Sequence, residues 1–447
     1  MSDDLDIAGR LLDLASRAGA DQADVLIIDD AAFSIGVADR ALEEAERAES
    51  RDIGLRVVVG AGQACVSSTD ATDAALAGMA ERAVALAREA PEDPNCGLAG
   101  ADEISSDADA ASLDLVDPAD PPDPAMLEAM AREAEDAALS VGNVTQVESA
   151  SATYTAATIS LAASNGFTGF YGRTNVSVGA AAIAGEGLGR ERDFAGESRR
   201  HRTDLPAPAE IGRRAGERAA AALAPRKPPG GAVPVLYDER VASGLIGHLV
   251  SAANGNAIAR GSSWLLDAMD REVLPRGFDL TEDPQRPRGA ASRPFDAEGL
   301  ASQVKPLVQD GILRRWVLDC ANARKLGLNS TGNARRGTGA PPSPGVTNLD
   351  LAVPNPVSRD DLIRQMGTGL IVTSFIGLSL SATTGNYSRG ASGFWVENGE
   401  IAYSVNEVTV AGSLPEILRT IVAADDADPW KSYRVPSLLV DGLTIGA

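Results

Sequence analysis

The chain is poor in the side chains that most often bind metals or act as general bases near neutral pH. Its 447 residues include two histidines, His201 and His248, and three cysteines, Cys65, Cys96 and Cys320. The cysteines lie far apart and form no C-x-x-C pair, which indicates buried or incidental thiols rather than a zinc or redox site. So few histidines exclude many catalytic designs that depend on imidazole.

Basic residues are also in deficit. The chain has 63 Asp plus Glu against 40 Lys plus Arg, and only four of the basic residues are lysines. Because nucleic acids and anionic membranes are bound mainly through Lys and Arg, the net charge of −23 argues against both as direct partners. Lysine-nucleophile chemistry likewise has few candidate residues.

Long apolar runs are absent as well. No segment reaches the roughly 18 consecutive apolar residues that a membrane-spanning helix needs. Three of the first six residues are aspartates, and this segment lacks the positive and apolar regions of a signal peptide. The sequence therefore predicts a soluble, cytoplasmic protein.

The patterns that are present predict an α+β fold. In the N-terminal part, helical spacing of apolar residues and strand-like alternation indicate helices at 5–17, 71–88, 125–139 and 207–224, and strands at 24–28, 33–38, 52–59, 63–68, 144–161 and 167–183. Short turns such as Gly60-Ala61-Gly62 and Asn165-Gly166 join neighbouring strands, which must then be antiparallel. This order is not the strand-helix-strand repeat of a nucleotide-binding sheet.

Two stretches rich in proline predict connections. Residues 91–124 combine Pro, Asp, Ala and Ser, which is typical of a long exposed linker. Residues 225–234 contain four prolines and two glycines and indicate a domain boundary near residue 230. We expect a mixed helix and antiparallel-sheet domain at 1–229, followed by a β-rich domain at 230–447.

The β-rich domain is expected to contain two helices besides its strands. After a short strand at 233–237, a helix is predicted at 240–253, and another near 358–369. His248 shares a small apolar face of the first helix and has no second ligand one turn away, so we expect a packed histidine with its hydrogen bonds satisfied. His201 stands among arginines and is expected in a solvated loop, and Ser392 is expected in a turn.

Three stretches of the C-terminal half, 283–289, 332–345 and 385–390, mix glycine with arginine and, in the first two, proline. Rigid backbone with forked guanidinium donors suits recognition of carboxylates or peptide backbone. The alternative, rigid turns whose arginines bind local carbonyl groups, is equally open. The candidate peptide-contact or interface residues in and beside these stretches are Arg286, Arg288, Arg293, Asn333, Arg335, Arg336, Asn386, Tyr387, Ser388 and Arg389.

These stretches belong to longer motifs that run through the whole chain in order. They include Asp52-Ile-Gly-Leu-Arg56-Val, Asn254-Gly-Asn-Ala-Ile-Ala-Arg260, Asp283-Pro-Gln-Arg-Pro-Arg-Gly289, Pro341-Pro-Ser-Pro-Gly345, Gly385-Asn-Tyr-Ser-Arg-Gly390 and Ile421-Val-Ala-Ala-Asp425-Asp426. In these motifs the sequence resembles the TldD/PmbA family, specifically its PmbA branch, which is also called TldE.

The resemblance implies a cytoplasmic metalloprotease complex of two subunit types. A TldD-type subunit carries zinc through an H-E-x-x-x-H helix and a later cysteine, and a PmbA-type subunit pairs with it. Implied substrates are unfolded or flexible peptides, including peptide-antibiotic precursors and antitoxins. In this chain the histidine positions of the motif fall at Ile246 and Ser251 and the glutamate position at Gly247, and residues 425–436 contain no cysteine.

Isoleucine, glycine and serine at these positions provide neither zinc ligands nor a base. The resemblance therefore implies a catalytically silent subunit, with no cofactor of its own and with zinc in its partner. The alternative is a homodimeric peptide-binding or regulatory protein without protease activity. The older family label, modulator of DNA gyrase, suggests nucleic-acid contact, which the net charge opposes. A peptide is expected to add to exposed strand edges of the β-rich half.

Overall fold

The computed structural model describes residues 2–106 and 109–446 of an α+β protein, as expected. Its N-terminal half contains helices α1 (Ser2–Ala18), α2 (Asp73–Glu89), α3 (Pro124–Leu139) and α4 (Pro208–Ala221), and strands β1 (Gln22–Ala38), β2 (Ala41–Val59), β3 (Gly62–Ser68), β4 (Val144–Ala163), β5 (Thr168–Ala184) and β6 (Glu191–Arg199). Short 3-10 helices are η1 (Ala111–Leu113), η2 (Gly187–Gly189) and η3 (Arg202–Asp204).

The C-terminal half is richer in strands. Its helices are α5 (Glu239–Ala252), α6 (Gly255–Ala259), α7 (Cys320–Leu326), α8 (Arg359–Met366) and α9 (Leu414–Thr420). Its strands are β7 (Gly231–Tyr237), β8 (Asp279–Glu282), β9 (Lys305–Gln309), β10 (Ile312–Leu313), β11 (Ala334–Arg335), β12 (Ser343–Pro344), β13 (Leu349–Ala352), β14 (Gly369–Leu380), β15 (Asn386–Glu397), β16 (Glu400–Ser413), β17 (Val422–Ala423), β18 (Tyr433–Arg434) and β19 (Leu438–Gly446). The short helices α6, α7 and α9 were not expected from the sequence.

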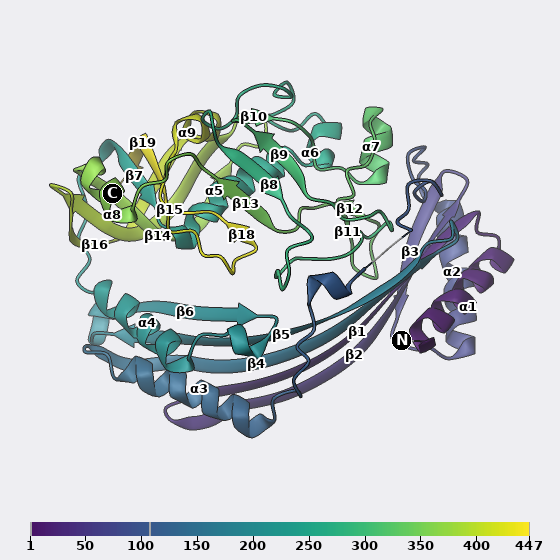
Figure 1. Ribbon diagram of the computed structural model, residues 1–447, viewed down its shortest axis with the longest axis horizontal. Coiled ribbons are helices and arrows are strands. Elements are labelled where there is room, and N and C mark those ends of the chain that lie inside the picture. The colour runs from purple at the N-terminus through teal and green to yellow at the C-terminus, as the bar shows by residue number, and fades with distance from the viewer. Residues whose placement is uncertain (1, 107–108, 447) are drawn as a thin grey trace.

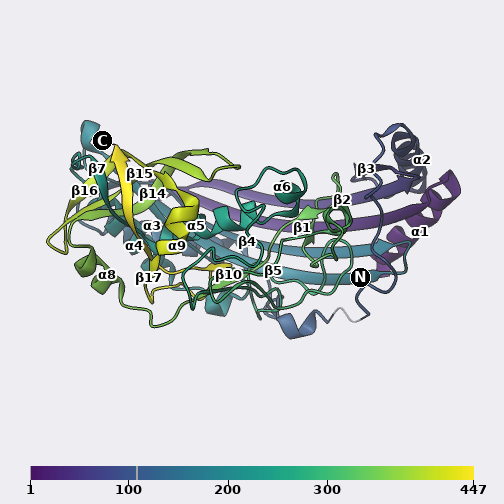
Figure 2. The same cartoon turned by 90° about the horizontal axis from the view of Figure 1, so that it is seen from above.

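Strands β1 to β6 form one antiparallel sheet in the order β3-β2-β1-β4-β5-β6. Figure 1 shows its long strands arching beneath the C-terminal half. Helices α3 and α4 lie below the strands, and α1 and α2 lie at the end of the sheet away from the C-terminal half. The view from above in Figure 2 shows the same separation of α1 and α2.

The prediction of separate strands at 24–28 and 33–38 is wrong, because both lie within β1. The first part of β1 packs with α1 and α2 through residues such as Ile27, and its last part packs with α3 and α4 through residues such as Val37. Between these two cores, residues 29–34 contain no fully buried side chain. One strand that serves two cores therefore has the apolar pattern of two strands.

The first half of β2 was missed for a related reason. Residues 41–50 are exposed at every position, so they carry no apolar alternation that could mark a strand. Their position is set by pairing with β1 through a two-residue turn at Asp39 and Arg40, both with positive φ (49° and 58°). Positive φ at both central residues is typical of the hairpin turns that match strand twist.

The prediction of an exposed linker at 91–124 holds for only part of the described segment, which contains both exposed and buried residues. Leu98, Leu113 and Leu115 are buried in a cluster that contains Phe295 of the C-terminal half. The backbone N–H of Arg288 donates to the carbonyl of Leu113 at 2.8 Å. The described part of this segment therefore fastens the two halves together, because its few leucines find apolar partners far along the chain.

In the C-terminal half, β7, β14, β15, β16 and β19 form a closed ring of pairings, because β16 pairs with both β15 and β19. A smaller sheet has the order β10-β9-β8-β13-β18. The large core around these strands includes the buried face of α5. Within the described ranges, no helix is both long and apolar enough to cross a membrane. A domain boundary near residue 230 stays a prediction.

A buried ion-pair cluster joins the halves. Asp24 on β1 accepts a hydrogen bond from Arg56 Nε at 2.7 Å and also pairs with Arg336 of the C-terminal half. All three side chains are at most 3 % exposed. Beside them, a Cβ on Gly54 would lie 2.3 Å from the carbonyl oxygen of Thr338. The motif around residues 52–57 therefore builds the contact between the halves.

Candidate functional site

Helix α5 carries the three positions at which the family motif would place zinc ligands and a base. Asp238 caps its start, where Oδ1 accepts the N–H of Arg240 at 3.3 Å. Ile246 is fully buried in the core, whereas Ser251 is exposed and its hydroxyl donates to the carbonyl of Gly247 at 2.8 Å. An alkyl group, a hydrogen atom and a hydroxyl already bonded to the helix do not fit a zinc ion.

His248 lies on the same helix and packs as expected. Its ring contacts that of Tyr387 edge to face, with centroids 5.5 Å apart. The expectation of satisfied hydrogen bonds is wrong, since buried Nε2 has no partner in the described chain. Burial and the positive charge of Arg389 lower the pKa of His248, so the ring is neutral at physiological pH. In the alignment expected from the sequence, it lies between the two ligand positions of the family motif.

The remaining candidate ligands are also dispersed. His201 is buried, and its Nε2 lies 3.1 Å from the carbonyl oxygen of Asp114, so the expectation of a solvated loop is wrong. Cys65, Cys96 and Cys320 are free thiols whose pKa is raised by burial, which leaves them poorly reactive. Across residues 2–106 and 109–446, no group of three His, Cys, Asp or Glu side chains could hold a metal ion.

The first arginine-rich stretch is tied down by carboxylates from distant segments. Arg286 donates to Asp350 at 2.7 Å and to the carbonyl of Lys431 at 2.9 Å. Arg288, at a positive φ of 53°, donates to Asp114 at 2.6 Å and to Asp204 at 2.9 Å. Both side chains therefore hold loops in place. Arg293, just beyond this stretch, donates through Nη1 to the carbonyl of Ala334 at 2.7 Å.

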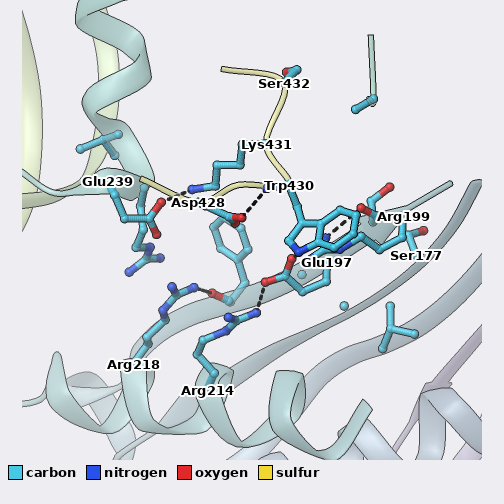
Figure 3. A pocket seen from close by; sticks show the side chains of 18 of the residues that line it. Ser177, Glu197, Arg199, Arg214, Arg218, Glu239, Asp428, Trp430, Lys431 and Ser432 are labelled. Atoms are coloured by element: carbon cyan, nitrogen blue, oxygen red, sulfur yellow. Dashed lines mark hydrogen bonds and ion pairs between the residues drawn. The ribbon is translucent and has the colours of Figure 1, made fainter. Parts of the chain in front are cut away.

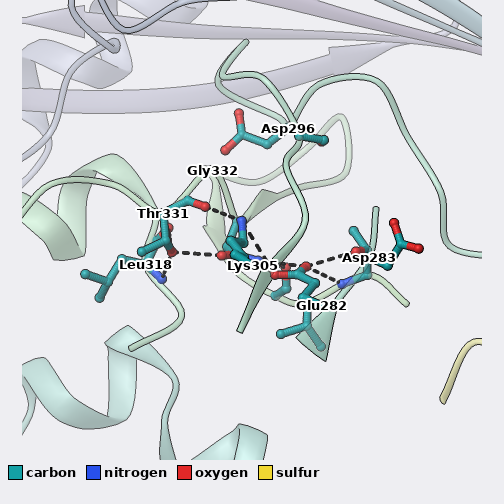
Figure 4. A network of polar contacts seen from close by, with 12 residues as sticks. Glu282, Asp283, Asp296, Lys305, Leu318, Thr331 and Gly332 are labelled. Carbon is teal, nitrogen blue, oxygen red and sulfur yellow. Dashed lines mark hydrogen bonds and ion pairs between the residues drawn. The ribbon is translucent and has the colours of Figure 1, made fainter. Parts of the chain in front are cut away.

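The second stretch contains a buried polar network centred on Glu282 (Figure 4). Its carboxylate accepts both Asn333 Nδ2, at 2.8 Å, and the N–H of Thr347, at 2.7 Å. Lys305 Nζ lies 3.5 Å from the same carboxylate and donates to the carbonyl of Thr331. Asn333 therefore has a positioning role in the loops. Arg335 is exposed, and Arg336 forms the buried pair with Asp24.

The third stretch is not a loop, because Asn386, Tyr387, Ser388 and Arg389 begin strand β15. Tyr387 is buried, Ser388 and Arg389 are half-buried and Asn386 is exposed. Ser392 also lies in β15, opposite Ser374, so the turn predicted there is wrong. Pairing with β14 and β16 therefore holds these residues in a regular strand, although their glycine-rich sequence predicts a loop.

A cavity of about 800 Å³ lies between the halves and was not foreseen (Figure 3). Strands β5 and β6 and helix α4 line it from one side; the start of α5, strand β14 and residues 428–432 line it from the other. We call it the central cavity. Strand β6 is an edge of the first sheet, so one side of its backbone is unpaired with another strand. No described lining residue is a histidine or cysteine.

Charges around the central cavity are mostly compensated within the protein. Arg199 donates to Glu197 at 2.9 Å, and its guanidinium lies 4.8 Å from the ring centroid of Trp430. Arg240 of α5 pairs with Asp193 of β6 at 2.5 Å and so links the two halves. Such a surface favours a ligand held by main-chain and apolar contacts over one held by net charge.

The central cavity could not be found from the sequence. Its lining residues come from segments that are up to hundreds of residues apart in the sequence, and none of these segments contains a recognisable sequence motif. The one local feature near it is the group of basic residues at 199–202, where the sequence predicts a solvated loop around His201. The structure buries Arg199 and Arg200 instead.

Comparison with known proteins agrees with this architecture. Models of the PmbA/TldA metallopeptidase domain 1, central domain and C-terminal domain match residues 23–87, 117–223 and 230–447. The metalloprotease PmbA of Escherichia coli O157:H7 is 35 % identical over 436 residues, which cover 97 % of this chain and 94 % of that protein.

Two solved structures share the fold over the whole chain. A protein of Bacteroides thetaiotaomicron that carries the name modulator of DNA gyrase superposes with a TM-score of 0.92 at 25 % identity and covers 100 % of this chain and 99 % of its own. TldE from Thermococcus kodakarensis superposes with a TM-score of 0.84 at 18 % identity, and the match covers 99 % of this chain and 100 % of TldE. At this identity the match supports the fold alone. The chain therefore belongs to the PmbA/TldD family of metallopeptidases, on its PmbA branch.

Proposed function

We propose that this chain is the catalytically silent, PmbA-type subunit of a cytoplasmic heteromeric metalloprotease. The proposal rests on the chemistry of α5, where the sequence resemblance aligns Ile246, Gly247 and Ser251 with the zinc ligands and the base of the family motif. Hydrolysis of a peptide by zinc needs three protein ligands and a group that moves the proton of the attacking water. Zinc is expected in a TldD-type partner, and the family includes proteins named metalloprotease TldD.

In this proposal the chain helps to bind the substrate. The central cavity offers the edge of β6, to which an extended peptide can add through main-chain hydrogen bonds. The closed ring of strands in the C-terminal half leaves fewer free edges there than the sequence suggested. Recognition through the main chain has little sequence preference, which suits unfolded peptides such as antibiotic precursors and antitoxins.

The proposal is tested by assaying the chain alone, a TldD-type subunit alone and their mixture. We expect the isolated chain to contain no stoichiometric zinc and to leave a flexible peptide intact. The mixture should elute as a heteromer on size exclusion and hydrolyse the peptide. A TldD-type subunit whose two zinc-helix histidines are replaced by alanine is the control and should abolish hydrolysis in the mixture.

Hydrolysis by the isolated, metal-free chain would overturn the silent role. A stable homodimer that neither binds the TldD-type subunit nor changes its activity would favour the binding or regulatory alternative. Affinity for DNA that falls steeply with salt would support the gyrase label and contradict the charge argument.

A further inference from the structure

A second cavity, of about 270 Å³, lies where the first sheet faces segments 290–297 and 335–347 of the C-terminal half. One wall is apolar and comes from β1 and β4, with Leu26 and Ile159 among its side chains. The other wall carries arginines, so we call it the arginine cavity. It is separate from the central cavity, and only Ala290 lines both.

Four arginines line this cavity: Arg173, Arg293, Arg335 and Arg336. Among the described lining residues, Asp296 is the sole carboxylate. Its oxygens already accept the backbone N–H groups of Glu298, Leu300 and Ala334 at 2.9, 3.0 and 3.0 Å. The lining therefore carries three more positive than negative side chains, although the net charge of the chain is −23.

Several guanidinium donors in this cavity are buried without a partner. Arg293 and Arg336 use Nη1 for the carbonyl of Ala334 and for Asp24, but Nε and Nη2 of both bond to nothing in the described chain. The Arg336 side chain is only 2 % exposed. A buried donor without an acceptor costs about 1–3 kcal/mol. A negative charge in the cavity would offset the cost of keeping these two charged side chains buried.

Arg173 adds a charge that the protein does not compensate. Its side chain has no ion pair or hydrogen bond within residues 2–106 and 109–446. Behind it, buried Arg200 donates to the carbonyl of Thr174 at 3.1 Å. Burial and the nearby charge of Arg173 lower the pKa of Arg200 to about 10. Positive charges therefore repel one another here, and a bound anion would relieve the repulsion.

We propose that the arginine cavity binds a compact carboxylate-bearing ligand with an apolar body. The carboxylate accepts a hydrogen bond from Arg173 and lies in the positive potential of Arg293 and Arg336, and the apolar body packs against the wall of β1 and β4. Because Arg335 is exposed, the cavity reaches solvent beside it. A volume of about 270 Å³ equals that of about nine liquid waters at about 30 Å³ each, which suits one amino-acid-sized group.

Calorimetric titration of the full chain with N-acetylleucine and N-acetylleucinamide tests this site, because the two probes differ only in the carboxylate. We expect the acid to bind at least about tenfold more tightly than the amide, since a hydrogen bond to a charged group contributes about 1.5–3 kcal/mol. Arg173→Gln removes a side chain without a protein partner, so the fold should persist while acid binding weakens about tenfold.

Arg190→Gln is the matched control, because Arg190 is an exposed arginine outside both cavities and should leave binding unchanged. Arg335→Gln, at the mouth, is a second binding variant with an expected several-fold weakening. A hexapeptide ending in leucine, as free acid and as amide, distinguishes the source of the ligand. Tighter binding of the peptide acid than of N-acetylleucine identifies a peptide C-terminus, and the reverse identifies a free small acid.

Either source supports a carboxylate site. Equal affinity for acids and amides, no binding of either acid, or acid binding that Arg173→Gln leaves unchanged would each overturn the proposal. This test measures binding to the chain alone and does not depend on protease activity in a complex with a TldD-type subunit. Failure of the carboxylate site would therefore not contradict the silent-subunit role, and failure of that role would not contradict the site.

Discussion

The ion-pair cluster between the halves makes a strong prediction about stability. Asp24 is 2 % exposed and is the only described carboxylate in ion-pair contact with Arg56 and Arg336, which are equally buried. Asp24→Asn keeps the volume of the side chain but removes its charge. Both guanidinium groups then stay buried and charged, with the more distant Glu298 as a remaining source of negative potential on Arg56.

The magnitude follows from burial. Breaking a buried ion pair by removal of one partner costs about 3–5 kcal/mol, because the other charge is left without compensation. Asp24→Asn leaves two such charges, and the amide oxygen can still accept one hydrogen bond. We therefore expect a loss of about 4 kcal/mol, a large part of the roughly 5–15 kcal/mol by which native proteins are stable.

Urea unfolding measures this loss. The four tryptophans, Trp264, Trp316, Trp395 and Trp430, all lie in the C-terminal half, so fluorescence reports on that half and far-UV circular dichroism on the whole chain. The control is Glu49→Gln, which breaks the exposed pair with Arg47 and should leave the midpoint nearly unchanged. A loss for Asp24→Asn no greater than that of the control would refute the reasoning.

Three further predictions concern packing and pH. Gly54→Ala should destabilise the protein by about 1–3 kcal/mol, because the added Cβ would meet the backbone of Thr338. Gly9→Ala should raise the melting temperature, because Gly9 lies on α1 with open space around it and alanine favours a helix. Calorimetry measures the melting temperatures of both variants. Burial and Asp296 raise the pKa of Glu298 to about 7, so the native state holds the proton more tightly than the unfolded chain and stability is lost as pH rises from about 4.5 to 7. Glu298→Gln should therefore have a higher melting temperature than the parent protein at alkaline pH and the same melting temperature at low pH. If the difference in melting temperature between the two proteins did not change with pH, this prediction would be contradicted. The pKa of His248 is lowered, so native stability is lost as pH falls below its ordinary value of 6.5. His248→Phe should flatten this acid limb of the melting profile, and an unchanged limb would count against the burial argument.

The arginine-rich stretches show how far sequence reasoning reached toward the candidate site. In the first stretch, Arg286 and Arg288 are held by several hydrogen bonds, but the partners of these arginines are remote in sequence. Arg288 meets Asp114, which lies 174 residues away, and Arg286 meets Asp350, which lies 64 residues away. Whether a guanidinium group is neutralised depends on such long-range contacts, which local sequence motifs do not reveal.

The sequence by itself determined the α+β class, most helices, the β4–β5 hairpin and the family, because apolar periodicity, turn residues and ordered motifs are local properties of the chain. Tertiary structure alone decided the continuity of β1, the exposed half of β2, the burial of Leu98, Leu113 and Leu115, and both cavities. Each of these depends on which distant segment covers a given face. Burial and electrostatic compensation act through space, so the ion pair between Asp24 and Arg336 forms only when the two halves pack together.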